Sequence, residues 1–235
     1  MGSQLDTGKF LYLKKQELGS DESELIAKLE VCTQSIYRWL QYCQYHYVNL
    51  DDAVKEPNLR LDRAALSLTR AGETVAVRYV YEANIVGFLH SLHALLDSFP
   101  YLLNLFIPVI KDFESTSIKW HQSFIDKYRE QAFHSELTEL LMDSTFHKVK
   151  GYANTIKHKH LIRILNHWDH LEFDVFSYKR PYLDEDGVLK FSLATVSEEH
   201  VIPFIQDCHN ELIPKFFNLC ESVLSSKICQ LENDL

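Results

Sequence analysis

The chain has 235 residues, and its 46% of hydrophobic and 12% of aromatic residues are enough to build a sizeable core. With only 7 Gly and 6 Pro, the composition excludes collagen-like and largely disordered proteins and favours helices over a β fold with many turns. The formal net charge of −9 argues against a protein that coats nucleic acid with its whole surface, because phosphate binding requires clustered cations.

In the first third of the chain, apolar residues recur at spacings of three and four, as on one face of a helix. These residues are Leu25, Leu29, Cys32, Ile36, Trp39 and Leu40. Ser20 or Asp21 can cap this helix, which we expect to run to about Tyr47. The other elements expected here are a short strand or docked arm at 10–13, a loop at 49–58 and a short helix at 59–70.

The region from Glu73 to about Phe106 predicts the longest helix. From Ala83 onward it is apolar on nearly every side, which is typical of the central helix of a bundle. Pro100 should kink or break it. Asp97 is the one formal charge between 83 and 110, but uncharged polar residues are frequent there, so we expect a buried helix rather than a membrane span.

The second half of the chain predicts further helices and one β-hairpin. The expected helices lie at 115–132, at 135–148 with Gly151 interrupting, at about 154–165 and at about 197–230. Alternating apolar residues on both sides of an Asp186-Gly187 turn predict a hairpin at about 171–195. The expected fold class is therefore mainly all-α: a single domain, 1–235, built as an irregular helical bundle with one β-hairpin insertion.

A basic segment lies between Ser144 and Trp168, where the sequence contains no Asp or Glu. In a chain of net charge −9, this asymmetry indicates either a solvated face or a site for an anion or phosphate. Aromatic and imidazole rings beside the cations suit stacking on single-stranded RNA. The residues that we expect to contact RNA are Lys148, Lys150, Tyr152, Lys159, His160 and Arg163.

A second group of residues has the chemistry to hold a phosphate oxygen and to move a proton. Asn154 and His158 are four residues apart and share a helix face, Lys157 lies beside them, and Asn154 is expected to cap the helix. Asp97 lies in an otherwise apolar helix, so the sequence predicts a buried carboxylate that needs a partner. That partner is either a structural polar network or the candidate pair Lys157 and His158. The candidate catalytic set is thus His158, Asn154, Lys157 and Asp97.

Metal chemistry is a further alternative. His90, His93 and Asp97 share one helix face and, with His158 or His160 from another helix, could build a site of nitrogen and oxygen ligands. Twelve His residues make chance pairs common, so we assign no metal ligand and expect no cofactor. The five cysteines form no CxxC pair, which favours reduced, buried thiols in a cytoplasmic protein.

The segment Phe88-Leu89-His90-Ser91-Leu92 with Leu96-Asp97, followed by Asn154-Thr155-Ile156-Lys157-His158, resembles the HEPN superfamily of small helical domains. The resemblance covers roughly residues 75–165 and implies a helical bundle. Many members are metal-independent endoribonucleases, and others bind RNA or act as accessory domains. Their signature is an Arg a few residues before a His, and the two usually meet at a dimer cleft. With His158 as the signature His and Asn154 as the polar residue, the Arg position falls on Ala153, Tyr152 or Gly151, none of them basic.

Together these features predict a HEPN-like domain with a basic groove that binds RNA or another phosphate-bearing partner, and they leave cleavage open. We expect a homodimer, because the apolar residues from Ala83 to Ile110 would leave surface to cover. One alternative is a non-catalytic interaction or scaffold domain of a bacterial defence or stress system. The other is a metal-dependent hydrolase that uses the His90, His93 and Asp97 face.

Overall fold

The computed structural model describes residues 5–18, 23–56, 67–70 and 72–233, which are mainly helical with a few short antiparallel strands. Among these residues no helix is both long and apolar enough to cross a membrane. The chain divides into two compact units. The first unit comprises Met1–Trp39, Ala94–Asp143 and Ile213–Leu235, and the second comprises Leu40–His93 and Ser144–Leu212. The expectation of one domain over 1–235 stays a prediction.

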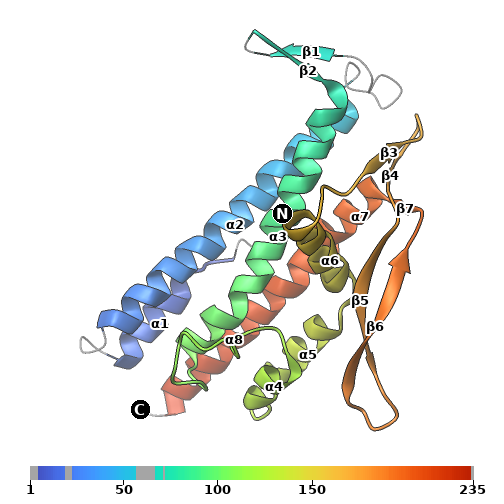
Figure 1. Cartoon of the computed structure of the whole chain (residues 1–235). Coiled ribbons are helices and arrows are strands. Elements are labelled where there is room, and N and C mark those ends of the chain that lie inside the picture. Colours follow the sequence, from blue (N-terminus) through green and yellow to red (C-terminus); the bar gives the residue numbers. More distant parts are fainter. Residues whose placement is uncertain (1–4, 19–22, 57–66, 71, 234–235) are drawn as a thin grey trace. The chain divides into compact units, whose positions relative to one another are not determined.

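Most of the helical residues belong to four helices: α1 (Gly8–Leu18), α2 (Ser23–Lys55), α3 (Val77–Phe106) and α8 (Ile213–Asn233) (Figure 1). The predicted helices in the regions of α2, α3 and α8 are therefore confirmed, although α2 continues through the expected loop as far as Lys55. The bounds differ at two other places, because residues 73–76 and 199–200, which were expected to be helical, form strands. Residues 10–13 belong to α1, so the prediction of a strand or arm there was wrong. Phe10 is fully buried, and its ring packs edge-to-face with the ring of Phe106, with the two centroids 4.9 Å apart. This contact explains why the segment packs as an amphipathic helix.

In the first unit, α3 passes through Pro100 without a break. A proline cannot donate a hydrogen bond to the carbonyl four residues earlier, and here that carbonyl belongs to Leu96. The indole N–H of Trp120 donates to the Leu96 oxygen at 2.6 Å instead. The Trp120 ring also stacks on Phe99 with centroids 5.9 Å apart. Of the two effects predicted for Pro100, a kink or a break, the break does not occur, and a side chain distant in sequence satisfies the free carbonyl.

The remaining elements of the first unit are short: α4 (Gln122–Ile125), the 3-10 helix η3 (Asp126–Tyr128) and α5 (His134–Met142). The predicted helix over 115–132 forms only from Gln122 to Tyr128, because local side chains bind backbone groups in the segment before it. The Asp112 carboxylate accepts from the Glu114 N–H at 3.0 Å, and the Ser115 hydroxyl accepts from the Ser117 N–H at 3.3 Å. The chain therefore turns repeatedly before α4 begins.

The second unit holds the described strands. The hairpin β1 (Ser67–Arg70) and β2 (Glu73–Ala76) precedes α3, so the expected short helix does not extend over 67–70; the rest of that prediction, at 59–66, falls outside the described residues. Strands β3 (Ile164–Asn166), β4 (Leu171–Phe173) and β7 (Glu199–His200) form an antiparallel sheet in the order β3-β4-β7. Strands β5 (Phe176–Leu183) and β6 (Leu189–Val196) form the predicted hairpin, and Gly187 adopts a φ of 73° in its turn. The hairpin begins at Phe176 rather than at about 171, because β4 pairs with β3 and β7 instead.

Helix α6 (Ser144–His158) lies against β5 (Figure 1) and is continuous through Gly151. The predicted interruption at Gly151 was wrong, and the predicted helix over 154–165 ends at His158, before β3. Gly151 is needed for packing instead, because a Cβ atom there would lie only 2.7 Å from the Cβ of Tyr178. The unit is completed by α7 (Val201–Asp207) and by one π-helical turn, η4 (Cys208–Leu212), before α8.

The apolar side chains of α3 are buried within the chain itself. Fully buried examples are Phe88, Leu89, Leu92, Leu95, Leu96, Phe99, Leu102, Leu103, Leu105 and Phe106. The sequence argument for a homodimer required this surface to be left uncovered, so the argument no longer applies. Free thiols are confirmed: Cys32, Cys43, Cys208 and Cys220 are buried and Cys229 is exposed.

Candidate functional site

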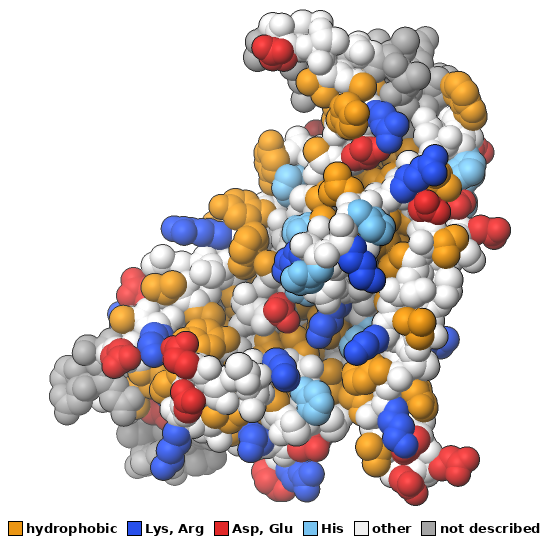
Figure 2. Space-filling view, viewed as in Figure 1, with side chains coloured by type: hydrophobic (Ala, Val, Ile, Leu, Met, Phe, Trp, Pro, Cys, Tyr) orange, Lys and Arg blue, Asp and Glu red, His pale blue; other side chains and the backbone are white. Residues whose placement is uncertain are grey.

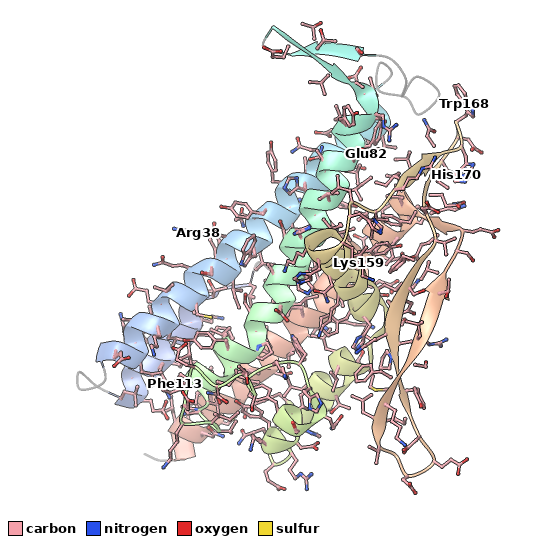
Figure 3. The ribbon with its side chains drawn as sticks, viewed as in Figure 1. Arg38, Glu82, Phe113, Lys159, Trp168 and His170 are labelled. Atoms are coloured by element: carbon pink, nitrogen blue, oxygen red, sulfur yellow. The ribbon has the colours of Figure 1, made fainter. Side chains whose placement is uncertain are left out.

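The end of α6 and the loop that follows it carry a series of exposed basic side chains, which we call the cationic segment (residues 157–163). Its exposed members are Lys157, His158, Lys159, His160 and Arg163. Helix C-termini favour cations because their last carbonyls are unpaired and the helix dipole is negative there. On the face shown in Figure 2, Lys, Arg and His side chains gather over this end of α6, and Figure 3 labels Lys159 within it.

Two of the residues predicted to contact RNA turn inward instead. Lys148 donates a hydrogen bond to Oε1 of Glu199, and the Tyr152 hydroxyl donates to Oε2 of the same carboxylate at 3.1 Å. Tyr152 is fully buried and its ring stacks on Phe176 with centroids 3.9 Å apart. The predicted stacking of Tyr152 on RNA is therefore wrong. Lys150 is half-buried, so the exposed part of the basic segment begins at Lys157.

The candidate catalytic residues are not arranged as the sequence suggested. Asn154 lies inside α6 rather than at its N-cap, because the helix begins at Ser144. Asp97 is exposed, so the premise of a buried carboxylate was wrong: it faces outward although Leu95, Leu96 and Phe99 nearby on α3 are buried. Asp97 belongs to the first unit, whereas Asn154, Lys157 and His158 belong to the second. Their assembly into one site stays a prediction.

Lys157 is linked to the histidines of α3 within the second unit. Its Nζ lies 3.4 Å from Nδ1 of His93, which is almost fully buried. The neighbouring His90 has a buried Nε2 that contacts no hydrogen-bonding partner among the described residues. Burial lowers the pKa of His90, and the positive charge of Lys157 lowers it further. The His90 imidazole is therefore kept neutral and is no acid at neutral pH.

A different group of side chains has the spacing of metal ligands. Ligand atoms of His167, His170 and Glu172 all lie within 4.8 Å of one another, on the turn between β3 and β4 and on β4. Sequence analysis had considered His90, His93 and Asp97 and missed this group. The signal was present, because His170 and Glu172 are two residues apart at the start of a predicted strand, with His167 only three residues before His170.

The same turn exposes a large aromatic side chain. Trp168 is 69% exposed and adopts a φ of 73°, a left-handed conformation that is uncommon for a bulky residue. The backbone N–H of Trp168 donates to Oδ1 of Asn166 at 2.9 Å, and the backbone N–H of His167 donates to the His170 carbonyl at 3.0 Å. These bonds hold the turn that places Trp168 at the tip of the hairpin (Figure 3).

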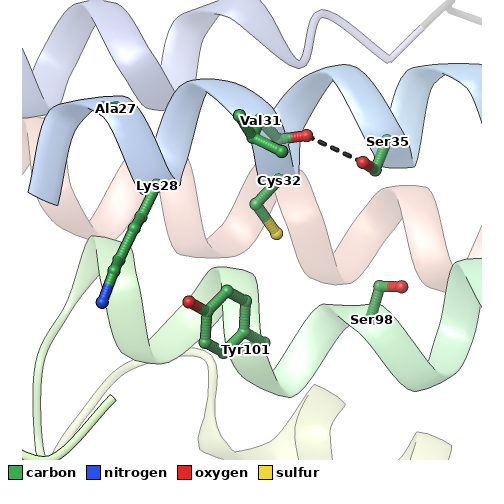
Figure 4. A pocket seen from close by; sticks show the side chains of 7 residues that line it. All are labelled: Ala27, Lys28, Val31, Cys32, Ser35, Ser98 and Tyr101. Carbon is green, nitrogen blue, oxygen red and sulfur yellow. Dashed lines mark hydrogen bonds between the residues drawn. The ribbon is translucent and has the colours of Figure 1, made fainter. Parts of the chain in front are cut away.

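The first unit contains a shallow apolar pocket of about 490 Å³ between α2 and α3 (Figure 4). Its lining residues are Ala27, Lys28, Val31, Cys32, Ser35, Ser98 and Tyr101. Burial raises the pKa of the Cys32 thiol to about 12, so Cys32 is not a nucleophile at neutral pH.

No protein-family model, curated protein or solved structure matches this chain.

Proposed function

We propose that the protein binds single-stranded RNA through the cationic segment, with Trp168 providing a stacking surface, and that it does not cleave the RNA. The observation that carries the proposal is the continuous exposure of five basic side chains over residues 157–163, in a part of the sequence without Asp or Glu. Backbone phosphates bind such clusters, and exposed aromatic rings stack on unpaired bases. Trp168 takes the stacking role that sequence analysis had given to Tyr152.

A HEPN-like fold is part of this proposal. It is supported by the mainly helical structure and by the position of Lys157 and His158 at the end of α6. The absence of cleavage follows from the residues at the expected Arg position. Ala153 and Tyr152 are fully buried, so neither they nor a basic replacement at those positions would reach a phosphate from the core. Of the candidate set, Lys157 and His158 therefore serve, in this proposal, for binding through their exposed side chains.

The number of cations predicts the salt dependence of binding. Lys157, Lys159 and Arg163 carry three full positive charges at neutral pH. Each phosphate contact to a single strand contributes about −0.7 to the slope of log K against log salt concentration, so three contacts predict a slope of about −2.

The test is fluorescence anisotropy with a labelled single-stranded RNA over a series of salt concentrations. The variant Lys157→Gln/Lys159→Gln/Arg163→Gln should weaken binding at least tenfold and remove most of the salt slope. Its matched control removes three exposed charges from the first unit, Lys9→Gln/Lys15→Gln/Arg38→Gln, and should retain wild-type affinity. Gel analysis should find the RNA intact after long incubation, with and without a chelator.

Equal losses for the two triple variants would show that net charge alone attracts the RNA and would overturn the assignment to residues 157–163. A chain that binds no single-stranded RNA at low salt would refute the function as a whole and favour the interaction or scaffold alternative. Cleavage that the variant His158→Ala abolishes would refute the non-catalytic part of the proposal.

A further inference from the structure

We propose that the outer face of the β3–β4 hairpin binds one divalent transition-metal ion of the zinc class, held by His167, His170 and Glu172. This site is separate from the cationic segment, and the inference does not rest on RNA binding. Two imidazoles and one carboxylate are a ligand set that suits Zn²⁺ and also Co²⁺ or Ni²⁺. Three protein ligands leave one position of a tetrahedral ion for water.

The distances are those of an open site that closes with small side-chain rotations. Oε2 of Glu172 lies 3.8 Å from Nε2 of His167 and 3.8 Å from Nε2 of His170. Ligands at about 2.1 Å from a tetrahedral zinc lie about 3.4 Å from one another. Each imidazole nitrogen therefore needs to approach the carboxylate by about 0.4 Å, and the two imidazole nitrogens, which lie within 4.8 Å of each other, need to approach each other by up to about 1.4 Å. Both separations are too long for hydrogen bonds, and each is an ion pair only when its imidazole is protonated.

Strand geometry explains why these side chains converge. Leu171 and Phe173 are buried and anchor β4, and the alternation of the strand directs Glu172 to the other face. His170 lies in the turn, one residue before β4, and its Nε2 lies 3.8 Å from Oε2 of Glu172. His167 joins them from the other end of the turn, which its own backbone bond to His170 closes at 3.0 Å.

A carboxylate behind His170 prepares that ring for a metal. Oδ1 of Asp169 lies 2.7 Å from Nδ1 of His170, so the proton of a neutral imidazole resides on Nδ1. The lone pair is then on Nε2, the atom that faces Glu172. An imidazole oriented in this way by a carboxylate is the usual arrangement at protein zinc sites. The His200 ring stacks on His170 with centroids 4.3 Å apart and further limits its rotation.

The experiment uses the full-length chain after removal of metal with a chelator. Co²⁺ should bind at one equivalent and develop the visible absorption of a tetrahedral ion, and Zn²⁺ should displace it. The variants His170→Gln and Glu172→Gln should lose the one-equivalent absorption. Asp169→Asn removes only the orienting carboxylate and should weaken Co²⁺ binding about 10- to 100-fold.

The chain has twelve His residues, so a matched control is needed. His121→Asn alters an exposed His in the first unit and retains a side chain that can cap α4. It should bind Co²⁺ as the wild type does. Circular dichroism of each metal-free variant checks that the fold is retained. No saturable binding by the wild type, or equal weakening in His121→Asn and His170→Gln, would overturn the site in favour of scattered surface histidines.

Discussion

The substitution Tyr152→Phe tests the buried network that replaces the predicted RNA contact. Burial raises the pKa of the Tyr152 hydroxyl far above its usual range, and the charge of Glu199 raises it further, so the group stays protonated and donates its hydrogen bond. Phe keeps the ring that stacks on Phe176 and removes only the donor. Glu199 would keep Lys148 as its partner.

The expected cost follows from the chemistry of that bond. A hydrogen bond to a charged group contributes about 1.5–3 kcal/mol to stability. The equilibrium constant of unfolding should therefore rise by about 10- to 150-fold, which urea titration followed by circular dichroism measures readily. The control is Tyr45→Phe, because Tyr45 is 63% exposed and its replacement should change stability by less than about 0.5 kcal/mol.

The double substitution Tyr152→Phe/Glu199→Gln sharpens the test. Because both residues belong to one network, its cost should differ from the sum of the two single costs. RNA affinity should be the same for Tyr152→Phe and the wild type. An unchanged urea midpoint in Tyr152→Phe would refute the buried network, and a loss of RNA affinity without a loss of stability would restore Tyr152 as an RNA contact.

Other outcomes follow from individual side chains. Gly151→Ala should lower the melting temperature, because the Cβ of the alanine would lie 2.7 Å from a side-chain atom of β5. Overpacking of this kind costs about 1–3 kcal/mol, more than the roughly 1 kcal/mol by which Ala stabilises a helix relative to Gly. Ellman's reagent should modify one thiol of the native chain, Cys229, and all five after denaturation. Burial and the charge of Lys157 lower the pKa of His90 in the folded chain below its value of 6.5 in the unfolded chain. As the pH falls below 6.5, the unfolded chain therefore takes up a proton at His90 before the folded chain does, and the free energy of unfolding should fall. In His90→Gln, urea titrations between pH 7.5 and 5.5 should find a smaller fall.

Periodicity and turn chemistry predicted the elements that depend on local sequence. The apolar spacing from Leu25 to Leu40 corresponds to α2, and the Asp186-Gly187 pair corresponds to the turn between β5 and β6. Both signals act over a few residues, so they do not depend on the rest of the fold. The errors arose where a distant residue supplies a partner. Trp120 replaces the hydrogen bond that Pro100 removes, and its sequence position gives no sign of this role.

The candidate site shows the same limit. The basic segment between 144 and 168 lacks acidic residues in sequence, but Glu199 reaches it from β7 and pairs with its buried half. Which cations remain exposed is therefore decided by tertiary packing against β5 and β7. Asp97 illustrates the reverse error: apolar neighbours suggested burial, but a helix turns 100° per residue, so one position between buried neighbours can still face outward.

The two proposals meet at Trp168, and their coupling can be measured. Trp168 lies between residues that the proposed ion would hold, His167 on one side and His170 two residues beyond. An ion there would fix the turn that presents the indole ring, and a ring fixed before binding loses less entropy when it stacks on a base. Coupled sites commonly change each other's affinity by about 5- to 150-fold. Zn²⁺ should therefore tighten RNA binding by the wild type about fivefold or more, and it should have no effect on Glu172→Gln or Trp168→Ala. An equal increase in Glu172→Gln would mean that the ion bridges protein and phosphate elsewhere, and the coupling through Trp168 would be refuted.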